Sequence, residues 1–239
     1  MMPVLCFGQN VNIPDANFKA YLVGNIDINT NGDGEIQLSE AIGYSGKIEC
    51  DSLSISDLTG IEAFTALTEL YCGSNQLTSL DVSGCTALKH LYCYDNQLTN
   101  LEVSGCTVLT DLECDKNKLT SLDLSNNNAL KHLLCFTNKL TNLDVSGCTA
   151  LSYLYCTNNK LTNLDVSGCT ALTDLACTNN KLTNLDVSNN TALSYLYCDG
   201  NKLTNLDVSK NTALTYLVCA GNKFDCDALK AKYGIKNID

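Results

Sequence analysis

The stretch LTNLDVSGCTALTDLACTNNK, residues 161–181, decides the fold of this 239-residue chain. It is one full copy of a 21-residue repeat in which the pattern L-x-x-L-x-C-x-x-N recurs at a fixed distance. Copies of this pattern begin at Leu67, Leu88, Leu109, Leu130, Leu151, Leu172, Leu193 and Leu214. A less regular copy precedes them at residues 48–58. Because a fixed repeat of this length is typical of solenoids, we expect about nine stacked coils.

The repeat follows the leucine-rich repeat pattern L-x-x-L-x-L-x-x-N-x-L, with cysteine in place of the third leucine. This pattern predicts one short parallel strand in each coil, with an asparagine where the chain turns away from the strand. Since side chains alternate along a strand, Leu70 and Cys72 should point inward, and Glu69 and Tyr71 outward. The predicted fold class is a curved α/β solenoid with a helical, EF-hand-like N-terminal cap and a short C-terminal capping helix.

The chain divides into four segments on this interpretation. Residues 1–9, MMPVLCFGQ, are interpreted as the remnant of a secretory signal peptide, because an apolar stretch runs there into polar residues. Residues 10–47 are the predicted N-terminal cap, 48–223 the solenoid and 224–239 the C-terminal cap. In the last segment we expect a helix that Asp225 caps and Gly234 ends, with Leu229 and Tyr233 on one face.

A calcium-binding loop is predicted in the N-terminal cap. The twelve residues from Asn29 to Glu40 match the EF-hand spacing, with Gly34 at the sixth position and Ile36 at the eighth. The spacing would place six hard oxygen donors around one structural Ca²⁺ ion. The predicted ligands are Asn29, Asn31, Asp33, Glu35, Gln37 and Glu40. The alternative is a turn without metal, which the string N-G-D-G also favours.

Two sets of cysteines follow the repeat. One forms a ladder down the interior, for which we expect free thiols that pack as small apolar groups; it comprises Cys50, Cys72, Cys93, Cys114, Cys135, Cys156, Cys177, Cys198 and Cys219. The second set, Cys85, Cys106, Cys148 and Cys169, lies at the predicted outer turn. A disulfide between Cys85 and Cys106, or between Cys148 and Cys169, remains an alternative there.

The residues that point outward from the strands vary between coils, although the scaffold positions do not. Tyrosines, both histidines and several acids gather on this face. Tyrosine combines a large rigid ring with a polar tip and is favoured at recognition surfaces. The predicted partner-binding residues are Tyr71, His90, Tyr92, Tyr94, Glu113, His132, Phe136, Tyr153, Tyr155, Tyr195, Tyr197 and Tyr216.

Composition excludes several other classes of function. The net charge is −11 and all fifteen basic residues are lysines, so neither nucleic acid nor an anionic membrane surface is an expected partner. No apolar run reaches the roughly 18 residues that a membrane span needs. The best catalytic candidate is His90 with Asp111 and His132, but this group would lie on an open face, so we do not expect an enzyme.

The motifs NIPDANFKAYL, DLTGIEAFTALTEL and LTNLDVSGCTALTDLACTNNK resemble those of internalin-like leucine-rich repeat proteins of the cysteine-ladder type. The resemblance covers residues 10–239 and implies a secreted or cell-surface bacterial protein that acts in adhesion or recognition. Internalins have a truncated EF-hand-like cap without calcium, whereas the loop here is complete. We therefore expect a non-catalytic module that binds a protein partner on its concave strand face. Carbohydrate binding by an exposed tyrosine stripe and a purely structural role are the alternatives.

Overall fold

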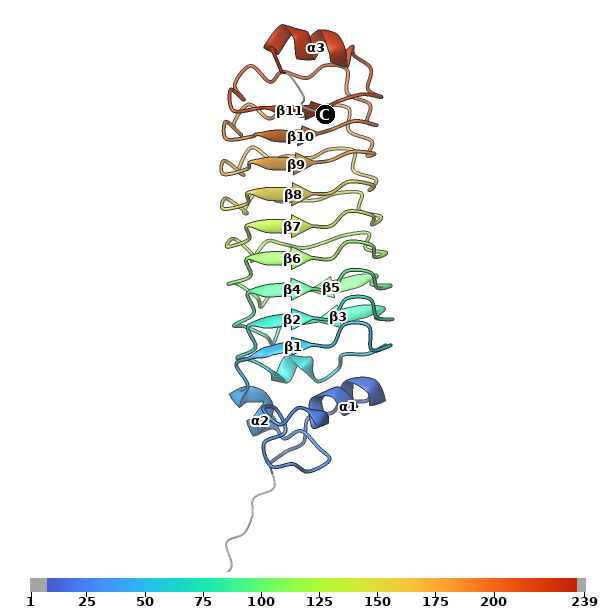
Figure 1. Ribbon diagram of the computed structural model, residues 1–239, viewed down its shortest axis with the longest axis vertical. Helices are drawn as coiled ribbons and strands as arrows, with labels where there is room; N and C mark the ends of the chain where they lie inside the picture. Colours follow the sequence, from blue (N-terminus) through green and yellow to red (C-terminus); the bar gives the residue numbers. More distant parts are fainter. Residues whose placement is uncertain (1–7, 236–239) are drawn as a thin grey trace, which may run out of the picture.

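The computed structural model describes residues 8–235 as a stack of coils with a helical cap at each end (Figure 1). Within that range, nine three-residue strands form one parallel sheet in the order β1-β2-β4-β6-β7-β8-β9-β10-β11. Their bounds are Lys47–Glu49, Glu69–Tyr71, His90–Tyr92, Asp111–Glu113, His132–Leu134, Tyr153–Tyr155, Asp174–Ala176, Tyr195–Tyr197 and Tyr216–Val218. The predicted leucine-rich repeat solenoid, with parallel strands from successive coils, is confirmed.

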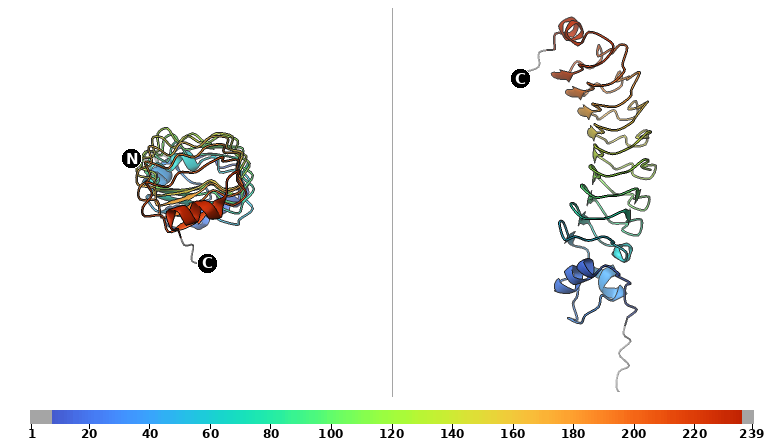
Figure 2. Two further views of the ribbon diagram at one scale, coloured as in Figure 1. Left: turned by 90° about the horizontal axis from the view of Figure 1, so that it is seen from above. Right: turned by 90° about the vertical axis from the view of Figure 1, so that its right-hand side faces the viewer.

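The opposite side of the stack contains little regular structure. Strands β3 (Ser79–Asp81) and β5 (Asn100–Glu102) pair there, and a 3-10 helix, η1 (Ile61–Ala63), precedes them. Figure 2 shows the stack gently bowed, with the long sheet on the inner side of the bow. The strand side is therefore the concave one.

The core follows the predicted alternation along each strand. Leu70 and Cys72 are fully buried, whereas Glu69 and Tyr71 are half-buried on the outer surface. The same pattern recurs in the other regular coils, so leucines and cysteines form continuous interior columns. Because each coil buries its apolar side chains against the adjacent coils, no coil has a complete core of its own.

A ladder of buried asparagines secures the turn after each strand. In one coil, Asn159 donates from Nδ2 to the carbonyls of Cys135 and Cys156, each at 3.0 Å, and its Oδ1 accepts the N–H of Leu140 at 2.9 Å. The residue before each such asparagine has left-handed backbone geometry, even where it is Lys116 or Thr137. These bonds hold a conformation that costs such residues about 1–2 kcal/mol.

The cysteines of the second set are free and buried, so the alternative disulfides are absent. Their thiols instead contact backbone carbonyls of the preceding coil: Cys106 Sγ lies 3.1 Å from the oxygen of Val82 and 3.6 Å from that of Cys85. In the next coil, Asn127 occupies the equivalent place and donates to the carbonyls of Val103 and Cys106. This position in the outer turn therefore needs a short, buried side chain that can donate a hydrogen bond. Cysteine and asparagine both meet this need, which explains why the coils carry one or the other.

The C-terminal helix α3 (Cys226–Tyr233) has the expected caps, with Asp225 before it and Gly234 after it. The prediction of an entirely unpaired interior ladder is wrong at its last rung, because Cys219 forms a disulfide with Cys226. The last coil has no further coil above it, and the helix that covers it brings Cys226 within reach. Since α3 has no fully buried residue, the disulfide is a main attachment of this cap.

The N-terminal cap contains α1 (Ala16–Gly24) and α2 (Leu38–Gly43), which cover the first coil. Asp15 caps α1 and also accepts hydrogen bonds from the backbone and hydroxyl of Ser56 in the solenoid. The hydroxyl of Tyr21 accepts the N–H of Glu49 at 2.8 Å, so the cap satisfies a donor at the edge of β1. The proposed signal-peptide remnant falls largely on residues 1–7, outside the described residues. Among residues 8–235, no helix has the length and hydropathy needed to cross a membrane.

Replacing Asn159 with alanine should lower the free energy of unfolding by about 2 kcal/mol, because the buried N–H of Leu140 would lose its acceptor. The carbonyls of Cys135 and Cys156 would each lose one donor and keep another, from Asn138 and Asn180. The measurement is the urea midpoint of Asn159→Ala against that of Asn163→Ala, which removes an exposed asparagine from the same coil. Equal midpoints for the two variants would contradict the structural role of the ladder.

The Cys226→Ser variant should lose about 2 kcal/mol of stability, since the seven-residue separation of Cys219 and Cys226 is no longer closed. Thermal unfolding with and without dithiothreitol checks this. The reductant should lower the midpoint of the parent protein and leave the midpoint of the variant unchanged. An equal reductant effect on both proteins would show that the disulfide does not hold the cap.

Candidate binding face

The outward residues of the long sheet form regular columns, which we call the strand face. The first column, from β2 to β11, consists of Glu69, His90, Asp111, His132, Tyr153, Asp174, Tyr195 and Tyr216. The second consists of Tyr71, Tyr92, Glu113, Leu134, Tyr155, Ala176, Tyr197 and Val218. The structure thus brings all but two of the predicted partner-binding residues into two adjacent columns. The remaining two, Tyr94 and Phe136, lie just beyond the ends of β4 and β7.

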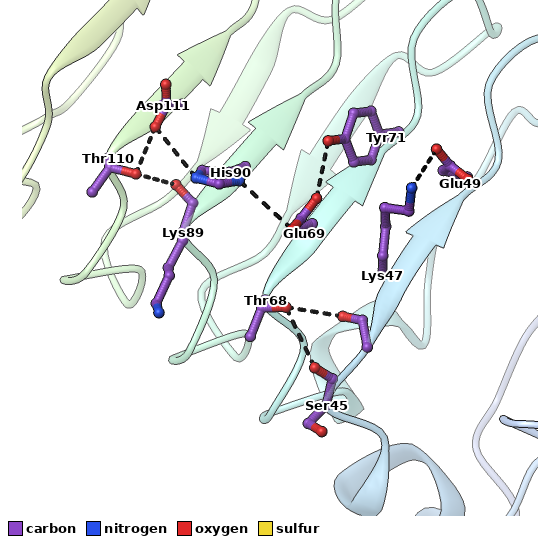
Figure 3. A network of polar contacts seen from close by, with 11 residues as sticks. Ser45, Lys47, Glu49, Thr68, Glu69, Tyr71, Lys89, His90, Thr110 and Asp111 are labelled. Carbon is purple, nitrogen blue, oxygen red and sulfur yellow. Dashed lines mark hydrogen bonds and ion pairs between the residues drawn. The ribbon is translucent and has the colours of Figure 1, made fainter.

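Acids and histidines alternate at the N-terminal end of the first column (Figure 3). His90 lies between two carboxylates, with Nδ1 3.9 Å from Glu69 Oε1 and Nε2 3.5 Å from Asp111 Oδ2. Asp111 also contacts His132 Nδ1 through its other oxygen and accepts a hydrogen bond from the hydroxyl of Thr110. Each histidine therefore has a carboxylate within ion-pair distance.

The electrostatics of Asp111 follow from these contacts. Burial acts to raise the pKa of its carboxyl group, but the hydrogen bonds from Thr110 and His132 and the nearby His90 outweigh burial and lower the pKa. The sequence analysis considered His90, Asp111 and His132 as a catalytic cluster, and the three do lie together. The carboxylate of Asp111 contacts both histidines across three neighbouring strands. These contacts form a row of alternating charges along the column.

The tyrosines form two clusters rather than one continuous exposed stripe. Tyr71 and Tyr92 pack near the N-terminal end of the face, with ring centroids 4.7 Å apart and planes tilted by 41°. At the other end, the ring of Tyr216 lies 5.3 Å from Tyr197 and 6.2 Å from Tyr195. Among these aromatic residues only Tyr153 and Tyr195 are substantially exposed, at 40% and 43%, because neighbouring rings and strands cover part of the others.

A carboxylate pair separates the two tyrosine clusters. Glu113 is half-buried beside Tyr92, and Asp115, two residues further along the chain, is only 5% exposed. Burial is the largest cause that raises the pKa of each carboxyl group, and for Glu113 the charges of Asp115 and Asp111 raise it further. The sequence analysis did not place Asp115 among the site residues, although its position two residues after Glu113 was a signal that it shares the same face.

Tyr94 reaches across the face because of a glycine in the preceding coil. A Cβ atom at Gly73 would lie only 2.6 Å from Cζ of Tyr94, so the ring occupies the space that a side chain would need. The N–H of Gly73 donates to Asp51 Oδ1, which fixes the backbone beneath the ring. Sequence reasoning missed this contact because it depends on two residues 21 positions apart.

The predicted calcium ligands in the N-terminal loop are engaged with one another. Asn31 Nδ2 contacts both Asp33 Oδ2 and Gln37 Oε1, and Asn29 donates to the carbonyl of Asp33. Glu35 forms a 2.7 Å ion pair with Lys19. Within residues 8–235, no group of three His, Cys, Asp or Glu side chains is arranged to hold a metal ion.

The position expected to be the bidentate ligand is also occupied by hydrogen bonds. Glu40 Oε1 accepts the N–H groups of Thr30 and Asn31, at 2.8 and 3.2 Å, while Oε2 accepts the N–H of Gln37 at 2.9 Å. These bonds close the loop and cap α2. As arranged, the residues do not fit the bidentate coordination that Ca²⁺ needs, and calcium binding stays a prediction of the sequence.

The Glu40→Ala variant should lose about 1–2 kcal/mol in EDTA as well as in calcium, because the three N–H bonds do not require an ion. Thermal unfolding in both buffers measures this loss, with Glu35→Ala as a control of equal charge from the same loop. A loss confined to the calcium buffer would show that an ion, and not the hydrogen bonds, holds the loop. The parent protein in the two buffers tests calcium binding itself.

Comparisons with known proteins agree with the observed fold. The family pattern described as Leucine Rich repeats (2 copies) matches residues 65–112. Internalin J of Listeria monocytogenes is 45% identical over 71 residues, which is 29% of this chain and 7% of that protein. A solved functional domain of internalin J from the same organism, described as including a cysteine ladder, matches at a TM-score of 0.81 and 44% identity. That match covers 90% of this chain and 48% of the other.

A more distant structure shows the same fold. Internalin C2 of Listeria monocytogenes matches at a TM-score of 0.68 and 18% identity, with 94% of each chain covered. The chain spans only 7% and 48% of the internalin J sequence and structure that it matches, so the similarity concerns the repeat region. The repeat pattern, the structural match and the interior cysteine columns together show that the chain has the fold of internalin-like leucine-rich repeat proteins of the cysteine-ladder type.

Proposed function

We propose that this protein is a non-catalytic recognition module that binds a protein partner through its strand face. The observation that carries the proposal is that the buried residues of the coils are constant, whereas the outward residues of the strand face differ from coil to coil. Leucine, cysteine and asparagine recur at the buried positions of the regular coils, while the adjacent outward positions vary among tyrosine, histidine, acids and aliphatic residues. A rigid scaffold with a varied, aromatic-rich concave face is suited to recognition of one partner.

The packing of the tyrosines supports this proposal. Tyr155, Tyr197 and Tyr216 are half-buried, so their rings are already ordered by neighbouring strands. Side chains that are ordered before binding lose less conformational entropy when a partner docks. The C-terminal tyrosine cluster is therefore the expected centre of the interface.

Export to the cell surface or the medium is part of the proposal. The disulfide between Cys219 and Cys226 suits an oxidising compartment, where such bonds persist. The twelve free cysteines among residues 8–235 are all buried, so they are shielded from oxidants there. Adhesion is the role that the resemblance of the repeat motifs to internalin-like proteins implies.

Carbohydrate binding is the second candidate. Tyr153 and Tyr195 lie two strands apart in the same column and are the most exposed rings of the face. Exposed aromatic rings can stack against sugar rings, and two strand spacings, about 9.6 Å, suit alternate rather than successive units of a sugar chain. A glycan array with the parent protein and with Tyr153→Ala/Tyr195→Ala distinguishes the two candidates, because only a sugar ligand would give array signals that the variant loses.

The triple variant Tyr155→Ala/Tyr195→Ala/Tyr197→Ala should bind its protein partner more than about tenfold more weakly, because central aromatic side chains carry much of the energy of an interface. A crosslinking pull-down from the native surroundings identifies the partner, and titration with the purified partner gives the affinity. The control variant Thr141→Ala/Thr162→Ala/Thr183→Ala changes exposed residues away from the strand face. Equal affinity of both variants and the parent protein would contradict the proposal.

A further inference from the structure

A row of exposed lysines follows the turn at which the chain leaves the long sheet. It comprises Lys118, Lys139, Lys160, Lys181, Lys202 and Lys223, and we call it the lysine row. Each member comes directly after the asparagine of that turn, and its backbone N–H donates to a leucine carbonyl of the preceding coil at 2.8 or 2.9 Å. The backbone therefore fixes the spacing of the row at one coil, about 4.8 Å.

The positive charges of the row are not neutralised by the rest of the protein. No ion pair within residues 8–235 includes a lysine of the row, although the net charge of the chain is −11. Lys118 donates to the amide oxygen of Gln97 at 2.9 Å, which brings no negative charge. A line of like charges held at a short, fixed spacing attracts an external anion.

The immediate surroundings of the row are neutral. From Lys118 to Lys202, no acidic residue lies within two positions of a row lysine. Asp115 and Asp199 lie three positions before these two lysines, but Asp115 is only 5% exposed and Asp199 accepts the hydroxyl of Thr178 at 2.7 Å. The exposed acids of the same coils lie five positions further along the chain. Because salt screens charges beyond about 8 Å, a ligand that lies directly on the row interacts mainly with the lysines.

Uncharged hydrogen-bonding groups accompany the lysines. Two positions after them stands a column of exposed threonines, which are Thr120, Thr141, Thr162, Thr183 and Thr204. Two positions before Lys160 and Lys181 stand Asn158 and Asn179, and Asn179 Nδ2 donates to Asn158 Oδ1 at 3.0 Å. Hydroxyl and amide groups both donate and accept hydrogen bonds, as the hydroxyl groups of sugars do.

These features select the kind of anion. Single-stranded nucleic acid is bound on aromatic side chains that stack with its bases, and from Lys118 to Lys202 no aromatic residue lies within two positions of a row lysine. An extended acidic peptide presents side chains on one side only every two residues, about 6.8 Å, which does not match the coils. A chain of uronic acids has one carboxylate on each sugar, and a sugar unit is about as long as the coil spacing of about 4.8 Å. The flexible stem of lysine lets the ammonium group follow the exact position of each carboxylate.

We propose that the lysine row binds a linear acidic polysaccharide that carries one carboxylate on each sugar unit and runs along the stack of coils. The ammonium groups pair with the carboxylates, and the threonine hydroxyls and asparagine amides bind the sugar hydroxyls. This inference goes beyond the proposed function, because the row lies outside the strand face and uses none of its residues.

The first test is calorimetric titration of the full chain with an oligogalacturonate long enough to span the row. EDTA in the buffer prevents metal ions from linking the sugar to exposed acids. The affinity should increase with the length of the oligomer until the row is covered, and it should fall as the salt concentration rises. The same oligomer with methyl-esterified carboxyl groups should bind at least about tenfold more weakly, because the ion pairs are lost. Equal affinity of the two oligomers, or equally tight binding of an oligothymidylate of the same charge, would overturn the proposal.

The second test removes charges from the row. The variant Lys139→Gln/Lys160→Gln/Lys181→Gln/Lys202→Gln should bind the oligogalacturonate at least about tenfold more weakly than the parent protein. Glutamine suits this position, since Gln76 and Gln97 occupy it in the first two regular coils with the same backbone hydrogen bond.

A matched control removes the same amount of charge elsewhere. The variant Lys89→Gln/Lys131→Gln/Lys210→Gln/Lys232→Gln changes exposed lysines outside the row and should keep the affinity within about twofold. Unfolding midpoints confirm that both variants fold. An equal loss in the two variants, or no loss in the first, would show that the row is not the binding site.

The tyrosine variant Tyr155→Ala/Tyr195→Ala/Tyr197→Ala separates this inference from the proposed function. It should bind the oligogalacturonate as the parent protein does, even though it loses the protein partner. If the strand face binds no partner, the sugar titration still tests the row, and if the sugar fails to bind, the recognition face is unaffected. Loss of sugar binding in the tyrosine variant would place the sugar on the strand face and overturn the proposal.

Discussion

The structure depends on the hydrogen bonds with which one buried asparagine in each coil joins two successive coils. At Asn159, the amide donates to carbonyls of both coils, and its oxygen accepts an N–H from the coil below. The backbone leaves the sheet at this point and would otherwise bury unpaired polar groups. The asparagine also holds the preceding residue in the left-handed region, so the turn has the same shape in coil after coil. Because the turn is constant, successive strands pair in the same register, and the same repeat positions point outward in every regular coil.

The cysteines meet a second constraint, which is the limited room between coils. In the interior ladder, cysteine follows leucine along each strand and fills a narrow space as a small apolar group. At the outer turn, the thiol of Cys106 is the donor toward carbonyls of the preceding coil, and it has no amide oxygen that would need a donor of its own. Asn127 makes comparable donor contacts, but its Oδ1 is buried without a partner, and the same holds at Asn190 and Asn211. Cysteine is thus the better fit of the two residues at this turn.

A scaffold held in this way leaves the strand face free to differ from coil to coil. The face has three regions in chain order. Acids and histidines pair around Asp111, Glu113 and Asp115 form no ion pair with another of residues 8–235, and tyrosines gather around Tyr216. Each region results from a few substitutions at outward positions of otherwise similar coils. The concave strand side of the solenoid carries all three regions.

The sequence by itself determined the repeat, the parallel strands, the inward cysteines, the asparagine turn after each strand of the regular coils, and the C-terminal helix with its caps at Asp225 and Gly234. These features follow from periodicity and local capping, which are written in consecutive residues. Only the tertiary structure decided that Cys219 pairs with Cys226, that the turn cysteines are unpaired, that Glu40 closes its loop with N–H groups, and that most face tyrosines are half-buried. The physical reason is that these properties depend on neighbours one coil away or in the caps. A repeat pattern fixes which positions share a column, but the packing of the particular side chains in that column decides what each can contact.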